Sequence, residues 1–320
     1  MKVWVIGRGG LLGSSVEKEC LISSEVYCPP NNFNWRDTNL VSQDLNACSH
    51  NFFGNLGNEN WAIYWCAGRG TLASTIDQMK NENQIFESLL RSIENTCPTG
   101  SRDRGVIFHA SSAGSIYGGS ENPPFTERTV PKPLTPYGDA KLGQEHSLSE
   151  FSKRLGIRVL VGRISNLYGA RQDLEKNQGL ISTICYSILR RQPINLFVPL
   201  ETSRNYIFVK DAAKTIVGHV NTLITLNESE KFKVKLIIAE ENLTIGSILN
   251  IAKTVFRTKP LVIVSSNKKG STEPQNLVFK SVNQIGSSSN IQTGFSVGIR
   301  QVMSELQSGF LAKGWYKSND

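Results

Sequence analysis

Tyr137 and Lys141, one helical turn apart, form the clearest chemical pattern in this sequence. A phenol with its reference pKa of about 10 is a poor base at neutral pH. An ammonium group held beside it favours the phenolate and moves its pKa toward the working pH. The pair is therefore a candidate acid/base that moves a proton to or from a substrate oxygen.

Two adjacent serines, Ser111 and Ser112, directly follow the apolar run 106–110. The run predicts a short buried strand, so the hydroxyls stand where that strand ends. A hydroxyl in this place can hydrogen-bond the substrate oxygen while the tyrosine moves the proton. Ser112 is the candidate catalytic hydroxyl, and Ser111 and Ser115 stay open as alternatives.

The stretch Thr135-Pro136 predicts the start of the helix that positions Tyr137 and Lys141. Threonine is a good N-cap, and proline suits the first helical position. Gly156 marks the expected end of this helix. A Tyr-x-x-x-Lys pattern also fits an ordinary amphipathic helix, but the preceding strand and the two serines favour the catalytic interpretation.

A glycine-rich turn follows the apolar stretch 2–6, with glycines at positions 7, 10 and 13. Such a turn lets the backbone approach a pyrophosphate and aims a helix N-terminus at the anion. A plain turn between a strand and a helix is the alternative. The residues expected to contact a dinucleotide lie in this turn, after the strand 61–66, or in the tyrosine helix: Gly7, Arg8, Gly10, Leu11, Gly13, Ala67, Gly68, Tyr137 and Lys141.

Buried strands alternate with helices through the first half of the chain. This order predicts an α/β fold, a Rossmann-type doubly wound parallel sheet covered on both faces, with a smaller C-terminal α/β substrate-binding region. We expect a dinucleotide-binding domain over residues 1–165 that carries the Ser/Tyr/Lys set. Residues 166–320 form the smaller substrate-binding domain, and the chain can cross between the two.

The composition fits a soluble globular protein of 320 residues, with 39% hydrophobic and 19% charged residues. The net charge of +8 comes from scattered lysines and arginines rather than a basic stripe, so we expect no nucleic acid. A basic balance also suits a small ligand that carries phosphates. The sequence contains no apolar run of membrane-spanning length, so we expect no membrane partner.

The six cysteines stand singly, without Cys-x-x-Cys pairs, so neither a metal site nor a disulfide framework is expected. Met1-Lys2 leads directly into the first strand, which is unlike a signal peptide. A reduced, cytoplasmic protein fits these features.

Taken in chain order, the glycine turn, the serine pair and Tyr137-x-x-x-Lys141 resemble the extended short-chain dehydrogenase/reductase family, in its NAD-dependent epimerase/dehydratase branch. The resemblance covers nearly the whole chain. The stretch 163–169 is similar to the branch's Arg-x-x-Asn-x-Tyr-Gly, whose asparagine, here Asn166, touches the substrate. The stretch 204–211 is similar to Arg-Asp-Tyr-x-x-Val-x-Asp, whose arginine, here Arg204, meets the nucleotide phosphates.

The resemblance implies an NAD(P)-dependent enzyme that transfers a hydride to or from the sugar of a nucleoside diphosphate sugar. Tyr137 would be the acid/base, Lys141 would tune its pKa, and Ser112 would bind the reacting oxygen. Three departures stand out. The stretch 112–117 has one residue more between Ser112 and Tyr117 than commoner members. Asn205 replaces the aspartate of the branch, and Glu82 falls near the place where many members have an asparagine.

The residues that follow Ser112 narrow the reaction. Ala113 and Gly114 stand where 4,6-dehydratases of the branch have an Asp-Glu pair, and the cysteine of the 3,5-epimerase/reductases is absent near Ser112. A 4-epimerase or a 4-ketoreductase remains, and the epimerase is favoured. The alternatives are a reductase of a ketone without a nucleotide, and an inactive relative that binds a dinucleotide.

The cofactor is NAD or NADP. The strand 25–28 ends without the carboxylate that usually holds the ribose of NAD, and Arg8 is within reach of a 2′-phosphate, which favours NADP. Asn31 or Asn32 could hold an unphosphorylated ribose, and an epimerase that recycles its cofactor typically keeps NAD. The resemblance also implies a homodimer, in which the helix over 72–95 and the tyrosine helix pair with their twins. The alternative is that both faces of the helix over 72–95 are buried within one chain.

Overall fold

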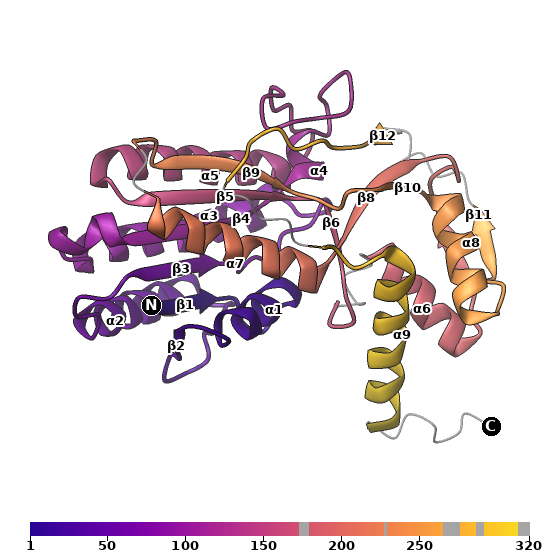
Figure 1. Cartoon of the computed structure of the whole chain (residues 1–320), viewed down its shortest axis with the longest axis horizontal. Helices are drawn as coiled ribbons and strands as arrows, with labels where there is room; N and C mark the ends of the chain where they lie inside the picture. Colours follow the sequence, from indigo (N-terminus) through magenta and orange to yellow (C-terminus); the bar gives the residue numbers. More distant parts are fainter. Residues whose placement is uncertain (173–178, 227–228, 265–275, 286–290, 313–320) are drawn as a thin grey trace.

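A six-stranded sheet forms the larger layer of the computed structural model, which describes residues 1–172, 179–226, 229–264, 276–285 and 291–312 (Figure 1). Its strands, in spatial order, are β2 (Glu25–Tyr27), β1 (Lys2–Ile6), β3 (Trp61–Trp65), β4 (Gly105–Ser112), β5 (Arg158–Ile164) and β9 (Phe232–Ile237). Every neighbouring pair in this sheet is parallel. The predicted parallel sheet is confirmed.

The central strands form because nearly every residue in them is apolar. All five residues of β1 and all five of β3 are buried. A parallel sheet covered on both faces requires such continuous apolar runs rather than the alternation of a half-exposed strand. Side chains of each strand therefore enter two separate cores, one above and one below the sheet.

Helices cover both faces of the sheet (Figure 1). One core lies against α2 (Thr38–Gly54), α3 (Ile76–Thr96) and α5 (Pro136–Leu155). The opposite core lies against α1 (Leu11–Cys20) and α7 (Val209–Thr225). This is the doubly wound arrangement that the sequence predicts.

The strand order places β1 between β2 and β3. The chain runs outward from β1 to β2 and then returns across β1 to β3. In open parallel sheets, ligands bind at such a switch point, outside the carboxyl ends of the strands. The glycine turn after β1 and residues 66–70 after β3 both lie at this edge.

The α3 helix starts later than the expected position 72. Thr75 caps it, because its hydroxyl accepts from Gln78 N while the Gln78 side chain accepts from Thr75 N. This capping box satisfies two backbone donors at the helix start. Five buried apolar residues of α3 belong to the core of the same chain: Ile85, Phe86, Leu89, Leu90 and Ile93.

A smaller region, built around a second sheet, lies beside the six-stranded sheet (Figure 1). Its strand β8 (Ser203–Phe208) pairs with β6 (Asn166–Tyr168), β10 (Asn242–Thr244) and β12 (Asn276–Leu277), and β7 (Ile194–Leu196) pairs with β11 (Val262–Val264). Three helices complete it: α6 (Leu180–Arg190), α8 (Ile245–Phe256) and α9 (Phe295–Ala312). The short helices η1 (Thr99–Arg104) and α4 (Ala113–Ile116) flank β4.

The chain crosses between the two regions after residue 165. Strand β9 adds to the edge of the large sheet beside β5, and α7 packs on that sheet. Glu127 ties β9 to the segment around Val282, because its carboxylate accepts from Leu236 N of β9 and from Val282 N. The described residues contain no helix that is both long and apolar enough to cross a membrane.

Candidate active site

The glycine turn is shaped by contacts that only glycine allows. Gly7 has a φ of +91°, in the left-handed region, and Gly10 N donates to Gly7 O at 2.9 Å. A Cβ atom on Gly13 would lie 2.2 Å from Gly7 O, so the first turn of α1 packs directly on the turn backbone. A side chain at either position would open this turn.

The start of α1 presents backbone N–H groups without a competing acid. Gly10 occupies the N-cap without a side-chain bond, and the first turn holds no acidic residue. Unpaired N–H groups at a helix start attract anions. Ala67 lies against the same turn, because a Cβ on Gly7 would be 2.6 Å from Ala67 N. The structure thus brings the glycine turn and the end of β3 together.

Arg8 projects from this turn toward the end of β2. Its guanidinium forms an ion pair with Glu17 of α1 at 2.8 Å and lies near the Cys28 side chain. The Arg8 side chain is 44% exposed. Asp37, the next acid after β2, instead caps α2 by accepting from Asn39 N and Leu40 N.

Tyr137 and Lys141 lie on α5, which begins as its residues predict. Thr135 Oγ1 accepts from Gly138 N at 3.2 Å, and Pro136 is the first helical residue. Lys141 is buried, and its Nζ donates to Gln144 Oε1 at 3.1 Å. The same Nζ lies 5.8 Å from the centroid of the Tyr137 ring.

The three candidate serines have different surroundings. Ser112 ends β4, accepts from Ser115 N as the N-cap of α4, and lies beside the Tyr137 phenol, whose pKa it lowers. Ser111 is buried and donates to Glu145 Oε1 at 2.6 Å. Ser115 Oγ donates to the backbone oxygen of Ser112 at 3.4 Å. Ser112 is thus the serine of this set that meets the tyrosine.

Glu82 of α3 brings a carboxylate into this site. One of its oxygens, Oε2, accepts from Arg69 N at 2.9 Å and from Gly70 N at 3.0 Å, so it holds the segment after β3. The other oxygen, Oε1, lies 3.7 Å from Lys141 Nζ. From the sequence, Glu82 differs from the asparagine that many members of the similar family branch have near this position. Its contact with Lys141 became visible only in the structure.

The electrostatic surroundings of Tyr137 differ from the expectation drawn from the sequence. Burial raises the pKa of the Tyr137 phenol, the nearby Glu82 carboxylate raises it further, and the hydrogen bond with Ser112 lowers it. Burial lowers the pKa of Lys141, while Glu82 opposes this shift. The expected lowering of the phenol pKa is therefore not found, because the phenol is buried and a carboxylate accompanies the ammonium group.

Asn166 and Arg204 lie on the neighbouring strands β6 and β8. Asn166 Nδ2 donates to Asn205 O at 3.0 Å. Arg204 is buried, and its Nη1 donates to Ser203 O at 3.0 Å. These two positions belong to the second region and stand outside the Ser112–Tyr137–Lys141 cluster.

The hydrogen bonds of Asn205 explain why an asparagine stands where the similar stretch of the family has an aspartate. Its Nδ2 donates to the backbone oxygens of Ala239 and Glu241 at 2.9 and 3.1 Å, and its Oδ1 accepts from Ala239 N at 2.9 Å. An aspartate has no hydrogen to donate to these two carbonyls. The amide thus ties β8 to the segment after β9, where a carboxylate would repel the carbonyl oxygens.

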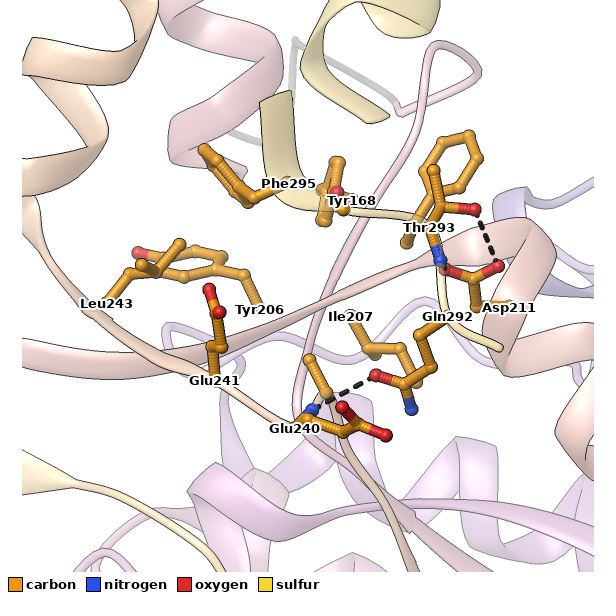
Figure 2. Close-up of a pocket in the computed structure, with 13 residues that line it drawn as sticks. Tyr168, Tyr206, Ile207, Asp211, Glu240, Glu241, Leu243, Gln292, Thr293 and Phe295 are labelled. Atoms are coloured by element: carbon orange, nitrogen blue, oxygen red, sulfur yellow. Dashed lines mark hydrogen bonds between the residues drawn. The ribbon is translucent and has the colours of Figure 1, made fainter. Parts of the chain in front are cut away.

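A pocket of about 120 Å³ lies on the face of β8 that carries Tyr206 (Figure 2). Tyr168 and Phe295 form part of its wall, and Asp211 accepts from both the backbone N and Oγ1 of Thr293 at 2.8 and 2.9 Å. Ser112, Tyr137 and Lys141 do not line this pocket. Within the described residues, no group of three or more His, Cys, Asp or Glu side chains is gathered as a metal site.

The model of a family described as the NAD dependent epimerase/dehydratase family matches residues 3–231 of the chain. Among curated proteins, a dTDP-4-dehydro-6-deoxyglucose reductase of Escherichia coli is 30% identical over 138 residues, which are 41% of this chain and 43% of that protein. The chain spans about two fifths of the length of the first curated relatives that it matches.

Solved structures share the fold over nearly their whole length. A UDP-glucose 4-epimerase of Thermus thermophilus, solved with NAD, is 19% identical with a TM-score of 0.76, over 96% of this chain and 99% of that chain. RMD from Pseudomonas aeruginosa, complexed with NADPH, is 16% identical with a TM-score of 0.74, also over 96% and 99%. At these identities the likeness shows a common fold.

Proposed function

Because the chain belongs to the NAD dependent epimerase/dehydratase family, we propose that it transfers a hydride between a nicotinamide dinucleotide and the sugar of a nucleoside diphosphate sugar. The observation that carries this proposal is the meeting of Ser112 and Tyr137 beside Lys141, next to the switch point of the sheet. The reaction is of the 4-epimerase or 4-ketoreductase type. The E. coli relative is named as a reductase and the T. thermophilus structure as a 4-epimerase, so the names of relatives support both.

The residues around the glycine turn suit a dinucleotide. The close packing of Gly7 and Gly13 keeps side chains away from the backbone, and the N–H groups of α1 suit a pyrophosphate. The cofactor, when bound, supplies or accepts the hydride. Tyr137 moves the proton to or from the reacting sugar oxygen, and Ser112 holds that oxygen by a hydrogen bond.

We place the nucleoside diphosphate sugar between the large sheet and the second region. Residues 1–165 would hold the cofactor, and most of residues 166–320 would hold the substrate. Arg204 would bind the diphosphate and Asn166 the diphosphate or the sugar, because a guanidinium suits bidentate contact with phosphate oxygens. The pocket in Figure 2 has Asp211, Glu240 and Glu241 in its lining, so its charge suits hydroxyl groups better than phosphates.

A thermal-shift panel tests this function. UDP-, dTDP-, GDP- and CDP-sugars are added to the protein with NAD or NADP, and we expect one class of nucleotide sugar to raise the melting temperature, since a ligand that binds the folded state stabilises it. A free aldose or a steroid-like ketone serves as the comparison. Stabilisation by one of these, without any response to the nucleotide sugars, would rule out the proposed substrate class.

Arg8 favours NADP, because it is half-exposed at the end of β2, where the adenosine ribose of a dinucleotide lies in such folds. We expect Arg8→Ala to weaken NADPH binding by about 10- to 100-fold, the loss of a charged hydrogen bond, and to leave NADH binding unchanged. Calorimetric titration with both nucleotides measures this, and NADH is the matched control. If Arg8→Ala weakened the binding of NADPH and NADH equally, or weakened neither, the assignment of Arg8 to a 2′-phosphate would be wrong.

We also propose a homodimer in which α3 and α5 pair with their counterparts. Ile76 at the start of α3 is 61% exposed, and a surface hollow of about 350 Å³ lies beside it, between α3 and α5. An apolar side chain at such a hollow is suited to burial against a second copy. Light scattering at micromolar concentration measures the mass, and a monomeric value would contradict the dimer.

A further inference from the structure

Glu82 presents one carboxylate oxygen to Lys141 of the catalytic pair. The side chain is 11% exposed. Its Oε1 is shielded from solvent and accepts no hydrogen bond from the described part of the chain. That oxygen lies 3.7 Å from Lys141 Nζ, close enough for a strong attraction in a site with little water.

The other oxygen fixes the wall of the site. By accepting from Arg69 N and Gly70 N, Oε2 holds the segment that follows β3. Gly70 lies against the Tyr137 ring, because a Cβ there would be 2.8 Å from Tyr137 Cδ2. A single carboxylate therefore faces the ammonium group and sets the backbone that covers the phenol.

The other ionisable groups around Lys141 leave this pairing intact. Cys66, directly after β3, has its thiol pKa raised by burial, and His109 on β4 has its pKa lowered by burial and by Lys141, so both are neutral near pH 7. Glu145, further along α5, forms a buried ion pair with Arg163 of β5 at 2.6 Å, and its charge also raises the pKa of Lys141, but less than Glu82 does. Glu82 is therefore the main carboxylate that balances the charge of Lys141.

This balance decides which form of Tyr137 is stable. An isolated ammonium group favours the phenolate, but a carboxylate beside it opposes that effect. Burial then disfavours the charged phenolate, so the phenol keeps its proton. A tyrosine in this form is ready to donate a proton and is a weak base.

Resting on the function proposed above, we propose that Glu82 is a positioning residue that keeps Tyr137 protonated and sets the site to reduce a ketone, as a ketoreductase rather than a 4-epimerase. In this reduction the C–H bond of the reduced nicotinamide breaks as its hydride forms a C–H bond at the ketone carbon. The ketone oxygen takes the proton of Tyr137 Oη, and water returns a proton to the phenolate. A 4-epimerase must first oxidise an alcohol, for which it needs the phenolate as base.

The direct test is a titration of Tyr137 in the protein without added cofactor or sugar. Tyrosine labelled with ¹³C at the ζ carbon reports the phenol by NMR, and Tyr137→Phe identifies the signal. We expect the wild-type Tyr137 to remain a phenol at about pH 8. In Glu82→Gln the backbone contacts can persist without the charge, and we expect the titration midpoint to fall by about one pH unit or more.

Asp77→Asn is the matched control, because it removes a carboxylate from the exposed start of the same helix. It should leave the Tyr137 midpoint unchanged. The proposal is overturned if Tyr137 is already a phenolate at about pH 8 in the wild type, or if Glu82→Gln titrates like the wild type. Glu82→Asn provides a second neutral variant, and a wild-type phenolate at about pH 8 would overturn the proposal even if neither variant folds.

A kinetic arm tests the direction of the reaction. With a nucleoside diphosphate 4-keto-sugar and reduced cofactor, the alkaline limb of the kcat/KM profile should move to lower pH in Glu82→Gln. Formation of an epimer from a nucleoside diphosphate hexose with oxidised cofactor would refute the ketoreductase assignment and leave the family function standing. Failure of all nucleotide sugars would refute the proposed function, while the NMR titration would still judge the role of Glu82.

Discussion

Replacing Tyr137 by phenylalanine should lower kcat/KM by about 10²- to 10⁴-fold on the nucleotide sugar that the thermal-shift panel identifies. The change removes the phenol hydroxyl, which we propose as the proton donor or acceptor, and keeps the ring that packs against Gly70. Cofactor binding and the melting temperature should therefore change little. The rate is followed by the absorbance of the reduced nicotinamide, and cofactor affinity by calorimetry.

Tyr186→Phe is the matched control for this loss. Tyr186 lies on α6 in the second region, where its ring stacks with Arg190, away from Ser112 and Lys141. Removal of its hydroxyl should leave kcat/KM within about twofold of the wild type. If Tyr137→Phe retained full activity on the true substrate, the catalytic assignment of Tyr137 would fail, whatever the family of the chain.

Replacing Glu145 by alanine should lower the free energy of unfolding by about 3–5 kcal/mol, because it leaves Arg163 buried without its counter-charge. Arg163 Nε donates to both carboxylate oxygens at 3.1 Å, and its Nη2 donates to Oε2 at 2.6 Å. Ser111 and Tyr117 also bind this pair, through Glu145 Oε1 and through Arg163 Nη1. Urea unfolding followed by circular dichroism measures the loss.

An exposed ion pair of similar length, which also involves α5, provides the control. Glu94 of α3 meets Arg154 of α5 at 2.8 Å, but their side chains are 35% and 57% exposed. Exposed pairs contribute about 0–1 kcal/mol, so Glu94→Ala should cost no more than that. A loss for Glu145→Ala no larger than for Glu94→Ala would show that burial does not strengthen the inner pair.

The double variant Glu145→Met with Arg163→Leu tests whether apolar side chains can replace the buried ion pair. Apolar residues of similar volume often replace a buried ion pair without loss of stability. We therefore expect the double variant to be more stable than Glu145→Ala. It should nevertheless lose activity, because Ser111 and the end of β4 would no longer be fixed beside Ser112.

The sequence by itself determined the features that depend on neighbouring residues. The apolar runs 3–6 and 61–65 predicted buried strands, since short continuous apolar runs bounded by turn residues suit a sheet covered on both faces. Thr135 and Pro136 predicted the start of α5, and the helical repeat then placed Tyr137 and Lys141 on one face. The order of these elements was enough for the parallel sheet and the family.

The sequence was less informative where pairing joins distant segments. Strand β8 has a mixed sequence, and its strand form depends on partners in β6, β10 and β12. The place of β9 at the edge of the large sheet follows from contacts with β5 and Glu127 rather than from its own residues. Strand propensity depends on such neighbours, so the strand form of β8 and the place of β9 in the sheet could not be assigned from local sequence.

Only the tertiary structure decided the charges and the protonation of the candidate site. From the spacing, Lys141 alone was expected to act on Tyr137, and the pKa of the phenol was expected to fall. The fold brings Glu82 of α3 to 3.7 Å from Lys141 and buries the phenol, so that pKa rises instead. Local spacing fixes which side chains share a helix face, whereas charge balance and burial depend on distant helices packed on the same sheet.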